Sequence, residues 1–405
     1  MIEPKLRFKA FSDELSHYAL MDIIVEKPSN GIMNRQSDKV TAVKHINVID
    51  MYTDDKIHVD ELSYSEYGDT AVEKCNVEIG DIFLTRSSVK ADGIAKSNIL
   101  LDDGIYVYDD HLIRLKVDKN NYIPEFVNDY LASPRFRRQF IVRAKTTAFT
   151  TIGQGDVASC TGDFPSLPEQ QKIADFLSTI DTVIEKQKET VSAWEERKKG
   201  MMQKLFSQEV RFKADDGSYL PDWEEKKIDD LFYKVNERNN GQFGKDKWIS
   251  VAKMYYQDED KVTSNNIDTR TYVMRVGDMS FEGHPNKEFK YGRFVVNDIG
   301  DGIISELFPI YRHKENYILK YWKYAIQVDS IMQKIYRKSI ISSGASSNKL
   351  DDDDFKRQSI LVPCLAEQQK IADCLSSFDE VIEKQKATLS AWEELKKGLL
   401  QQMFV

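Results

Sequence analysis

The stretch PEQQKIADFLS at residues 168–178 returns as AEQQKIADCLS at residues 366–376, 198 positions further along a chain of 405 residues. The likeness extends beyond this stretch, because 29 of the 42 positions from Pro165 to Phe206 are identical to those from Pro363 to Phe404. A long-period repeat of this kind indicates that one structural unit is present twice. We therefore expect a chain built from two related halves.

Each copy of the repeat has the apolar spacing of one long helix. The apolar residues recur at alternating steps of four and three, which is a heptad pattern. They are Ile173, Leu177, Ile180, Ile184, Val191, Trp194, Met201 and Leu205 in the first copy, and Ile371, Leu375, Phe378, Ile382, Leu389, Trp392, Leu399 and Met403 in the second. Gln187, Lys198, Gln385 and Lys396 fill the remaining heptad positions. About 38 residues at 1.5 Å each predict rods of about 57 Å.

A heptad stripe of this length needs a second stripe to pack against. The nearest one is the other copy of the repeat, so we predict two antiparallel helices that form a coiled coil. A pseudo-twofold axis would relate them, with one globular region at each end. The alternative is a homodimeric coiled coil that joins two chains. Ser166 and Glu169 have the spacing of a capping box, which marks the start of the first helix.

Three shorter echoes place a globular region before each helix. They pair Leu6–Ala10 with Val210–Ala214, Gly80-Asp81 with Gly277-Asp278, and Asn121–Ile123 with Asn316–Ile318. The expected strands are residues 48–52, 81–84, 105–108, 113–117, 272–276 and 293–296, and the expected short helices lie near 124–142 and 319–337. The predicted fold class is therefore α/β of the α+β type. Its two homologous domains are residues 1–164 and 209–362, followed by long helices at residues 165–208 and 363–405.

The composition is that of a globular protein, with 41% hydrophobic and 30% charged residues. No apolar run reaches the roughly 18 residues of a membrane span, and the first residues lack the pattern of a signal peptide. These features predict a cytoplasmic protein with no membrane partner. The four cysteines lack metal-site or disulfide spacing, which predicts reduced structural thiols and no metal.

The net charge of −9 counts against a nucleic-acid partner, because Lys and Arg normally supply the affinity for phosphates. A locally basic groove can nevertheless coexist with an acidic exterior. The long helices contribute little, with 7 basic and 7 acidic residues at 168–206 and 5 basic and 7 acidic residues at 366–405. The acidic excess therefore lies in the globular regions.

These motifs together resemble a known family. The P-x-x-x-E-Q-Q-x-I-A start at Pro165, the long heptad helix, its return after a second globular region and the Gly80-Asp-Ile-Phe run are similar to the specificity subunits of type I restriction-modification systems. The resemblance covers the whole chain in architecture, but its specific motifs lie mainly in the two helices. It implies two target-recognition domains that each read half of a bipartite, asymmetric DNA site, with the helices as a spacer.

The resemblance also implies partners: double-stranded DNA, two methyltransferase subunits, and restriction or translocase subunits. S-adenosylmethionine, ATP and Mg²⁺ would be bound by those subunits, so this chain would hold no cofactor and would not be an enzyme. The sequence agrees with this expectation, because it has no N/D-P-P-Y/F methyltransferase segment and no G-x-x-x-x-G-K-[S/T] phosphate loop. Two readers on one face of a duplex also need a spacing of about 34 Å, which a stiff coiled coil can hold.

Two loops in each half combine basic and small polar residues, which suit phosphates and base edges. In the first half the candidate DNA-binding residues are Arg86, Ser87 and Lys90 after the Gly-Asp strand, and Arg143, Lys145, Thr147, Thr150 and Gln154 before the long helix. In the second half they are Lys287, Lys290 and Arg293, and then Ser343, Ser346, Asn348 and Lys349. The alternative interpretation is a solvated helix face that runs into a polar surface loop.

Two other functions stay open on the sequence alone. An acidic scaffold or DNA-mimic protein would use the coiled coil to organise proteins without binding DNA, and the net charge supports it. A self-sufficient nuclease would cleave DNA with a metal, and Asp222, Glu225 and Lys227 have a superficial likeness to a nuclease motif. A DNA-binding assay with the partner methyltransferase present distinguishes the scaffold from a sequence-specific reader.

Overall fold

The computed structural model describes residues 4–53, 55–286, 289–342 and 347–404. The chain divides into two compact units, unit 1 (residues 1–190 and 386–405) and unit 2 (residues 191–385). Both dividing points lie inside long helices, α5 (Leu167–Phe206) and α10 (Leu365–Met403). Each unit therefore contains the start of one long helix and the end of the other.

Unit 1 contains two four-stranded sheets. The first, in the order β2-β10-β6-β8, joins β2 (Ser29–Asn30), β10 (Leu112–Leu115), β6 (Ile82–Thr85) and β8 (Ser97–Ile99). The second, in the order β3-β5-β4-β9, joins β3 (Gln36–Ser37), β5 (Ser63–Ser65), β4 (Val43–Ile46) and β9 (Ile105–Tyr108), with β4 parallel to β9. Smaller sheets pair β1 (Ser16–Ala19) with β13 (Thr161–Phe164), and join β11 (Lys145–Thr146), β12 (Thr150–Thr151) and β7 (Ser87–Ser88). The shorter α-helices are α1 (Asp69–Cys75), α2 (Pro124–Ala132), α3 (Pro134–Arg143) and α4 (Gln154–Ala158).

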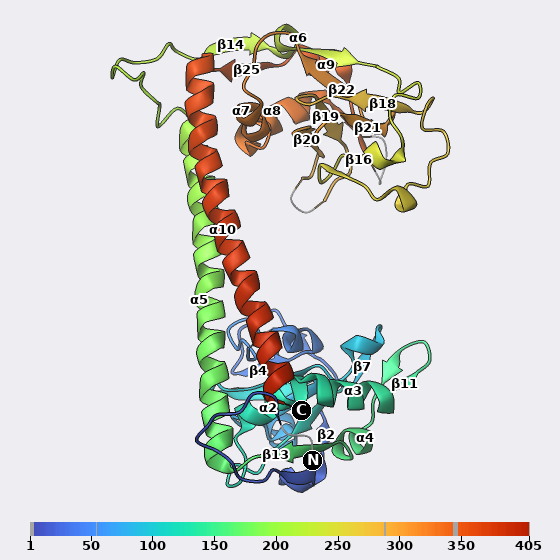
Figure 1. The fold of residues 1–405 in the computed structure, drawn as a ribbon, viewed down its shortest axis with the longest axis vertical. Helices are drawn as coiled ribbons and strands as arrows, with labels where there is room; N and C mark the ends of the chain where they lie inside the picture. Colours follow the sequence, from blue (N-terminus) through green and yellow to red (C-terminus); the bar gives the residue numbers. More distant parts are fainter. Residues whose placement is uncertain (1–3, 54, 287–288, 343–346, 405) are drawn as a thin grey trace. The chain divides into compact units, whose positions relative to one another are not determined.

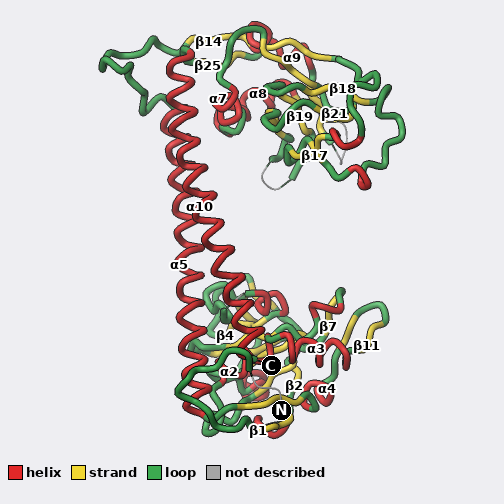
Figure 2. The backbone as a smooth tube through the Cα atoms, viewed as in Figure 1, coloured by secondary structure: helices red, strands yellow, loops and turns green. Residues whose placement is uncertain are grey.

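Unit 2 is built around one four-stranded sheet in the order β15-β22-β19-β20. Its strands are β15 (Phe232–Val235), β22 (Ile310–His313), β19 (Met279–Glu282) and β20 (Arg293–Val296). Two-stranded sheets pair β14 (Glu224–Lys227) with β25 (Ser359–Val362), β16 (Ile249–Ser250) with β17 (Tyr255–Tyr256), β18 (Thr271–Met274) with β21 (Gly302–Ser305), and β23 (Ile340–Ser342) with β24 (Asn348–Leu350). The shorter α-helices are α6 (Ile228–Leu231), α7 (Leu319–Ala325), α8 (Asp329–Ser339) and α9 (Asp352–Lys356). Figure 2 shows the short strands and helices of both units joined by loops.

The long helices pack antiparallel within each unit, as the heptads predict (Figure 1). In unit 1 the start of α5 shares a hydrophobic core with the end of α10, and this core includes Ile173, Leu177 and Phe404. In unit 2 the core joins the end of α5 to the start of α10 through Leu205, Phe206, Ile371 and Leu375. The apolar stripe of one copy therefore packs against that of the other copy in the same chain.

Burial along the stripe is uneven. Ile173, Leu177, Ile180, Ile184, Val191, Ile371, Leu375 and Ile382 are buried, whereas Trp194, Phe378, Leu389 and Trp392 are half-buried. In unit 2 the rings of Trp194 and Phe378 meet edge to face, with their centroids 6.0 Å apart. These two aromatic residues therefore form a cross-helix contact while keeping part of their surface exposed.

Lysines at the polar heptad positions form ion pairs with the opposite helix. Lys396 Nζ lies 2.5 Å from Asp181 Oδ1 in unit 1, and Lys198 Nζ lies 2.6 Å from Asp379 Oδ1 in unit 2. The two pairs are reciprocal, because each lysine and each aspartate recurs 198 positions later. A polar position in an otherwise apolar stripe can set the register of paired helices, and these pairs specify the antiparallel one.

Three local predictions are wrong. The single helix expected near 124–142 is two helices, because Pro134 begins α3 directly after Ser133, and the helix expected near 319–337 breaks between α7 and α8. Residues 48–52, expected as a strand, form a 3₁₀-helix (Val48–Tyr52). In that segment Asp50 accepts a hydrogen bond from the Asn47 amide at 2.6 Å, a local contact that competes with strand pairing.

Within the described part of the chain, no helix combines the length and apolar character needed to cross a lipid bilayer.

Candidate nucleic-acid interface

The repeated Glu-Gln-Gln motif attaches the start of each long helix to the globular part of its unit. In unit 1 Glu169 is 1% exposed, and its carboxylate accepts hydrogen bonds from Arg7 Nε and Nη2, both at 2.7 Å. The neighbouring Gln170 accepts a hydrogen bond from the Ile123 amide at 3.1 Å and donates one to the Pro165 carbonyl at 2.9 Å. The Arg-Phe-Lys echo, the Asn-Tyr-Ile echo and the helix start thus meet in one joint.

Unit 2 repeats this joint with equivalent residues. Arg211 Nη2 donates to the buried Glu367 carboxylate at 2.8 Å, and Trp223 Nε1 adds a further hydrogen bond at 3.1 Å. Gln368 accepts from the Ile318 amide at 3.3 Å and donates to the Pro363 carbonyl at 3.0 Å. Bidentate hydrogen bonds from an arginine to a buried carboxylate have a fixed geometry, so the joint orients the helix start in both units.

The Gly-Asp echo marks a second repeated contact, in the sheet that carries the candidate loops. In unit 1 Asp81 is fully buried beside Arg114, and burial raises its pKa to about 6. In unit 2 the Asp278 carboxylate accepts from Arg312 Nε at 2.7 Å and from Arg312 Nη2 at 2.8 Å. These pairs link the start of β6 to β10, and the start of β19 to β22.

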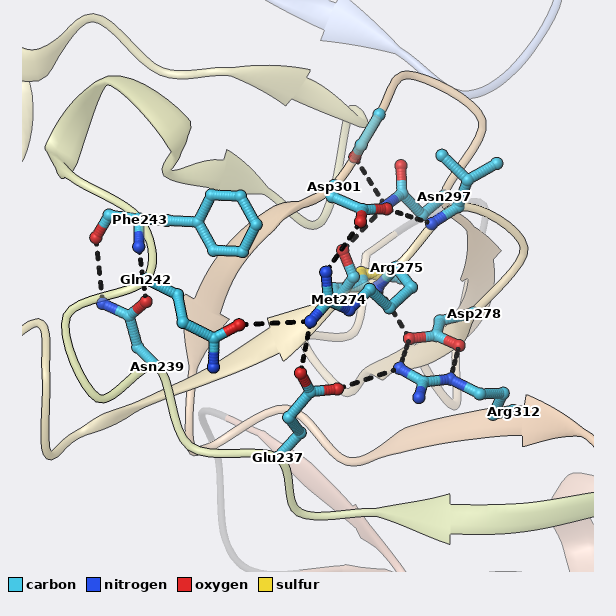
Figure 3. A network of polar contacts seen from close by, with 12 residues as sticks. Glu237, Asn239, Gln242, Phe243, Met274, Arg275, Asp278, Asn297, Asp301 and Arg312 are labelled. Carbon is cyan, nitrogen blue, oxygen red and sulfur yellow. Dashed lines mark hydrogen bonds and ion pairs between the residues drawn. The ribbon is translucent and has the colours of Figure 1, made fainter.

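A wider charge network surrounds the aspartate in unit 2, as Figure 3 shows. Arg275 Nη1 donates to Asp301 at 2.9 Å and Arg275 Nη2 donates to Glu237 at 2.5 Å, while Glu237 also accepts from Arg312. The guanidinium groups lower the pKa of Glu237, chiefly through the Arg275 hydrogen bond. Satisfied networks of this kind are rigid, so β19 and the loop that follows it start from a fixed platform.

The two candidate loops of the first half come together in unit 1. In the three-stranded sheet β11-β12-β7, Thr151 pairs with Lys145 on one side and with Ser87 on the other. Strand β7 comes from the loop after the Gly-Asp strand, and β11 and β12 come from the loop before the long helix. Backbone pairing therefore joins two segments that lie more than fifty residues apart in the sequence.

The equivalent loops of the second half also meet in unit 2. The Asn348 amide in β24 donates to the Gly283 carbonyl at 2.8 Å, and the Asn348 side chain donates to the Lys290 carbonyl at 3.4 Å. A Cβ atom added to Gly283 would lie 2.1 Å from the Asn348 carbonyl oxygen, so only glycine allows this close approach. Each unit thus presents one composite surface built from two separate loops.

The predicted residues of unit 1 divide by the direction of their side chains. Arg86, Lys90, Lys145 and Thr147 are exposed, and Ser87 and Arg143 are half-buried. Thr150 is only 2% exposed and contacts Thr146. Gln154 forms hydrogen bonds inside the protein, with Asn30. Thr151, which the sequence analysis did not select, is exposed on the face opposite Thr150, as strand alternation requires.

The predicted residues of unit 2 are described only in part, because Lys287, Ser343 and Ser346 lie outside the described residues. Lys290 and Lys349 are exposed, and Asn348 is half-buried between the two loops. Arg293 is half-buried and lies over the Phe289 ring at 4.5 Å, while its guanidinium donates to the Ala252 carbonyl. Arg293 is therefore partly engaged within the protein.

Some basic residues near the unit 1 surface have structural partners. Arg135 Nη1 lies 2.6 Å from Asp163 Oδ2, and Arg137 donates to the Ala95 and Asp92 carbonyls, both at 2.6 Å. The density of arginine in residues 135–143 therefore overstates the charge available to a ligand. Within the described part of the chain, Asp109, Asp110 and His111 could offer metal ligands, but His111 Nδ1 already lies 3.0 and 2.9 Å from the two carboxylates.

A family model described as the type I restriction modification DNA specificity domain matches residues 64–192 and 221–391, which together are more than half of the chain. The chain belongs to the type I restriction-modification specificity family. The two matches follow the internal repeat, since each covers most of one globular region and part of the long helix after it.

Two curated relatives of this specificity subunit are named as specificity subunits of type I restriction enzymes. The "Putative type I restriction enzyme MjaX specificity subunit" of Methanocaldococcus jannaschii is 24% identical over 408 residues, covering 93% of this chain and 90% of the relative. The type I restriction enzyme MjaVIII specificity subunit of the same organism is 25% identical over 262 residues, covering 58% of this chain and 59% of the relative.

Solved structures share the fold of this specificity subunit. A type I restriction-modification S subunit from M. genitalium superposes with a TM-score of 0.53 at 13% identity, covering 100% of this chain and 99% of that one. A second chain, from a structural study of type I R-M complex assembly and conformational transition, gives a TM-score of 0.56 at 14% identity, covering 96% and 97%. At these identities the likeness supports the architecture alone.

Proposed function

We propose that this chain reads a bipartite, asymmetric DNA site, with one half-site bound by the composite loop surface of each unit. The observation that carries the proposal is the pairing of two polar loops in both units, through Thr151 and Ser87 in unit 1 and through Asn348 and Gly283 in unit 2. In unit 1 the surface combines the exposed Arg86, Lys90 and Lys145 with Ser87 and Thr151. Basic side chains suit phosphates, while small polar residues allow close approach to base edges.

The two half-sites are expected to differ because the loop sequences differ. The segment TTAFTT at residues 146–151 has no counterpart in SSGASSNK at residues 342–349. By contrast, the Glu-Gln-Gln joints and the lysine–aspartate pairs are equivalent in both units. Equivalent joints and helix contacts that carry unlike loop sequences would account for an asymmetric target. We take residues 1–164 and 209–362 as the two target-recognition domains.

The repeated frame also favours two copies of one partner. Two near-equivalent surfaces in one chain can each bind the same subunit, and we infer that two methyltransferase subunits bind there, followed by the restriction or translocase subunits. The chemistry would then lie in those partners, with S-adenosylmethionine, ATP and Mg²⁺ bound by them. The chain itself would act as a reader without a catalytic site.

The acidic net charge of −9 limits the DNA affinity that the isolated chain can reach. Phosphate contacts from a basic partner would complete the binding surface around the duplex. We therefore expect tight, sequence-selective binding from the complex with methyltransferase, and weaker binding with a shallower salt dependence from the chain alone, which makes fewer phosphate contacts.

Mapping methylated adenines in the host genome, with and without this gene, tests the proposal. The expected result is a split motif of two unlike halves that disappears when the gene is deleted and returns when it is restored. A methylome that is the same in both strains would contradict the proposal. Deleting the partner methyltransferase gene is the control, and it should remove the same motif.

A further inference from the structure

Phe149 is an exposed aromatic residue at the tip of the β11–β12 hairpin in unit 1. All twenty phenylalanines lie in the described part of the chain, and Phe149 is the most exposed of them, at 56%. No other ring of the described residues contacts it. Phenylalanine side chains are most often buried, and the tip of this hairpin leaves the Phe149 ring accessible to a ligand of the candidate loops.

The hairpin holds Phe149 on the same face as the candidate DNA contacts. Exposure alternates through β12 and its two neighbouring residues, because Thr150 and Ile152 are each 2% exposed whereas Phe149 and Thr151 are exposed. Residues directly opposite each other in an antiparallel pair share a face, so Lys145 and Ser87 lie on the Thr151 side of the sheet. The outer face therefore presents one ring beside a lysine and two hydroxyls.

We propose that the β11–β12 hairpin enters the major groove and that the Phe149 ring contacts the C5-methyl group of a thymine in the half-site read by unit 1. This inference rests on the proposed function. The major groove admits a two-stranded ribbon, and thymine is the base that presents a methyl group there. An apolar ring among polar and basic residues adds base discrimination that lysine and threonine do not supply.

A wedge between stacked base pairs is the other role that an exposed aromatic side chain can have at a DNA surface. The hairpin favours groove contact, because β12 is held on both sides, by β11 and by β7, and Thr147 donates to the Phe149 carbonyl at 3.0 Å. Unit 2 has no equivalent ring in sequence, since residues 343–346 are Ser, Gly, Ala and Ser. The thymine contact should therefore belong to one half-site only.

The test uses the complete complex of this chain with its methyltransferase subunits, on duplexes that carry the mapped motif. Each thymine is replaced in turn by deoxyuridine, which removes only the methyl group. The wild-type complex should lose about three- to fivefold in affinity at one thymine, as expected for one buried methyl group. Phe149→Ala should bind less tightly and show no difference between thymine and deoxyuridine at that position, whereas Phe149→Leu should keep part of the difference.

Leu307→Ala is the matched control, because Leu307 is 82% exposed but lies in unit 2, outside the hairpin. It should leave the deoxyuridine response unchanged. A response equal in the wild type and Phe149→Ala, or a unit 1 half-site without thymine, overturns the inference while the proposed function stands. The same holds if 2-aminopurine fluorescence shows Phe149-dependent unstacking, which indicates a wedge. A chain that directs no split motif overturns both.

Discussion

The two units place different side chains against the same lysine–aspartate pair. In unit 1, Asp129 lies near Lys396 and Asp181, and burial raises the pKa of Asp129 to about 7. In unit 2 the corresponding residue, eight positions after the asparagine of the Asn-Tyr-Ile echo, is Tyr324, whose hydroxyl donates to Asp379 at 2.5 Å. The lysine–aspartate pair is thus the same in both units, whereas the group packed against it is a second carboxyl group in unit 1 and a hydroxyl donor in unit 2.

The repeat therefore keeps the lysine–aspartate ion pair in both units, but it does not keep the side chain that packs against that pair. Lys198 Nζ lies 5.1 Å from the centre of the Tyr324 ring, so unit 2 surrounds its ion pair with a hydrogen bond and an aromatic face. Unit 1 instead brings three ionisable groups together, of which two are acidic. We expect the pairing of the helices to depend on pH in unit 1 and to be insensitive to pH in unit 2.

The largest expected effect comes from the buried glutamates of the two joints. Glu367→Ala should reduce the free energy of unfolding by about 4 kcal/mol and Glu169→Ala by about 3 kcal/mol, because each leaves an arginine without its buried partner. The larger value belongs to Glu367 because Trp223 Nε1 also loses its acceptor. Urea denaturation of the full chain measures both.

Glu393→Ala is the control for that comparison, since Glu393 is exposed on α10. It should change the free energy of unfolding by less than about 0.5 kcal/mol. Equal, small effects for all three substitutions would show that the joints do not hold the helix starts.

The next effect is the pH dependence of unit 1. The folded state holds the Asp129 proton more tightly than the unfolded state, so this residue's stabilisation is present below about pH 4 and is lost as the pH rises towards 7. Because the side chain is only partly buried, we expect a loss of about 1–3 kcal/mol over this range. Asp129→Asn should remove this loss and make the chain more stable at pH 8, as thermal unfolding at a series of pH values would show.

Tyr324→Phe sharpens the same comparison in unit 2. It should destabilise the chain by about 1 kcal/mol, because Asp379 loses one hydrogen bond but keeps Lys198. Burial and Asp379 raise the pKa of Tyr324, so the hydroxyl stays protonated between pH 4 and 8 and the loss should be the same throughout. A loss that changes with pH over this range would contradict the contrast between the units.

The smallest effect is on DNA binding by two exposed lysines of the candidate loops, Lys145 in β11 of unit 1 and Lys349 in β24 of unit 2. Each alanine substitution should weaken binding of the complex about two- to fivefold on every sequence and reduce the slope of log K against log salt by about 0.9. An unchanged slope for either variant would remove that lysine from the interface. Salt titrations by fluorescence anisotropy give both quantities.

The paired long helices were easier to predict from the sequence than the loop surface proposed to contact DNA. The heptads and the internal repeat predicted α5, α10 and their antiparallel packing, because a 198-residue period and a seven-residue period are both visible in one chain. The Gly-Asp and Asn-Tyr-Ile echoes were also visible, but the sequence did not show which contacts these residues make. Only the structure shows that Asp81 and Asp278 are buried beside arginines and that the Ile123 and Ile318 amides bind Gln170 and Gln368.

The reading surface could not be derived because it depends on pairing between distant segments. Nothing local to residues 86–90 shows that Ser87 pairs with Thr151, and register alone decides that Thr150 points inward. Glu169 was likewise predicted to close a capping box, whereas its carboxylate binds Arg7, 162 positions away. The predicted set of DNA contacts remains a prediction, with Thr151 and Phe149 now added to it.

We propose that the repeated long helices and their joints carry two unlike DNA-binding surfaces, one in each unit. Replacing residues 209–362 with a second copy of residues 1–164, and then sequencing the methylome of the host, tests it most directly. The claim predicts a symmetric motif in which one half of the natural motif appears twice as an inverted repeat. A folded variant that still directs methylation of the natural asymmetric motif would contradict it.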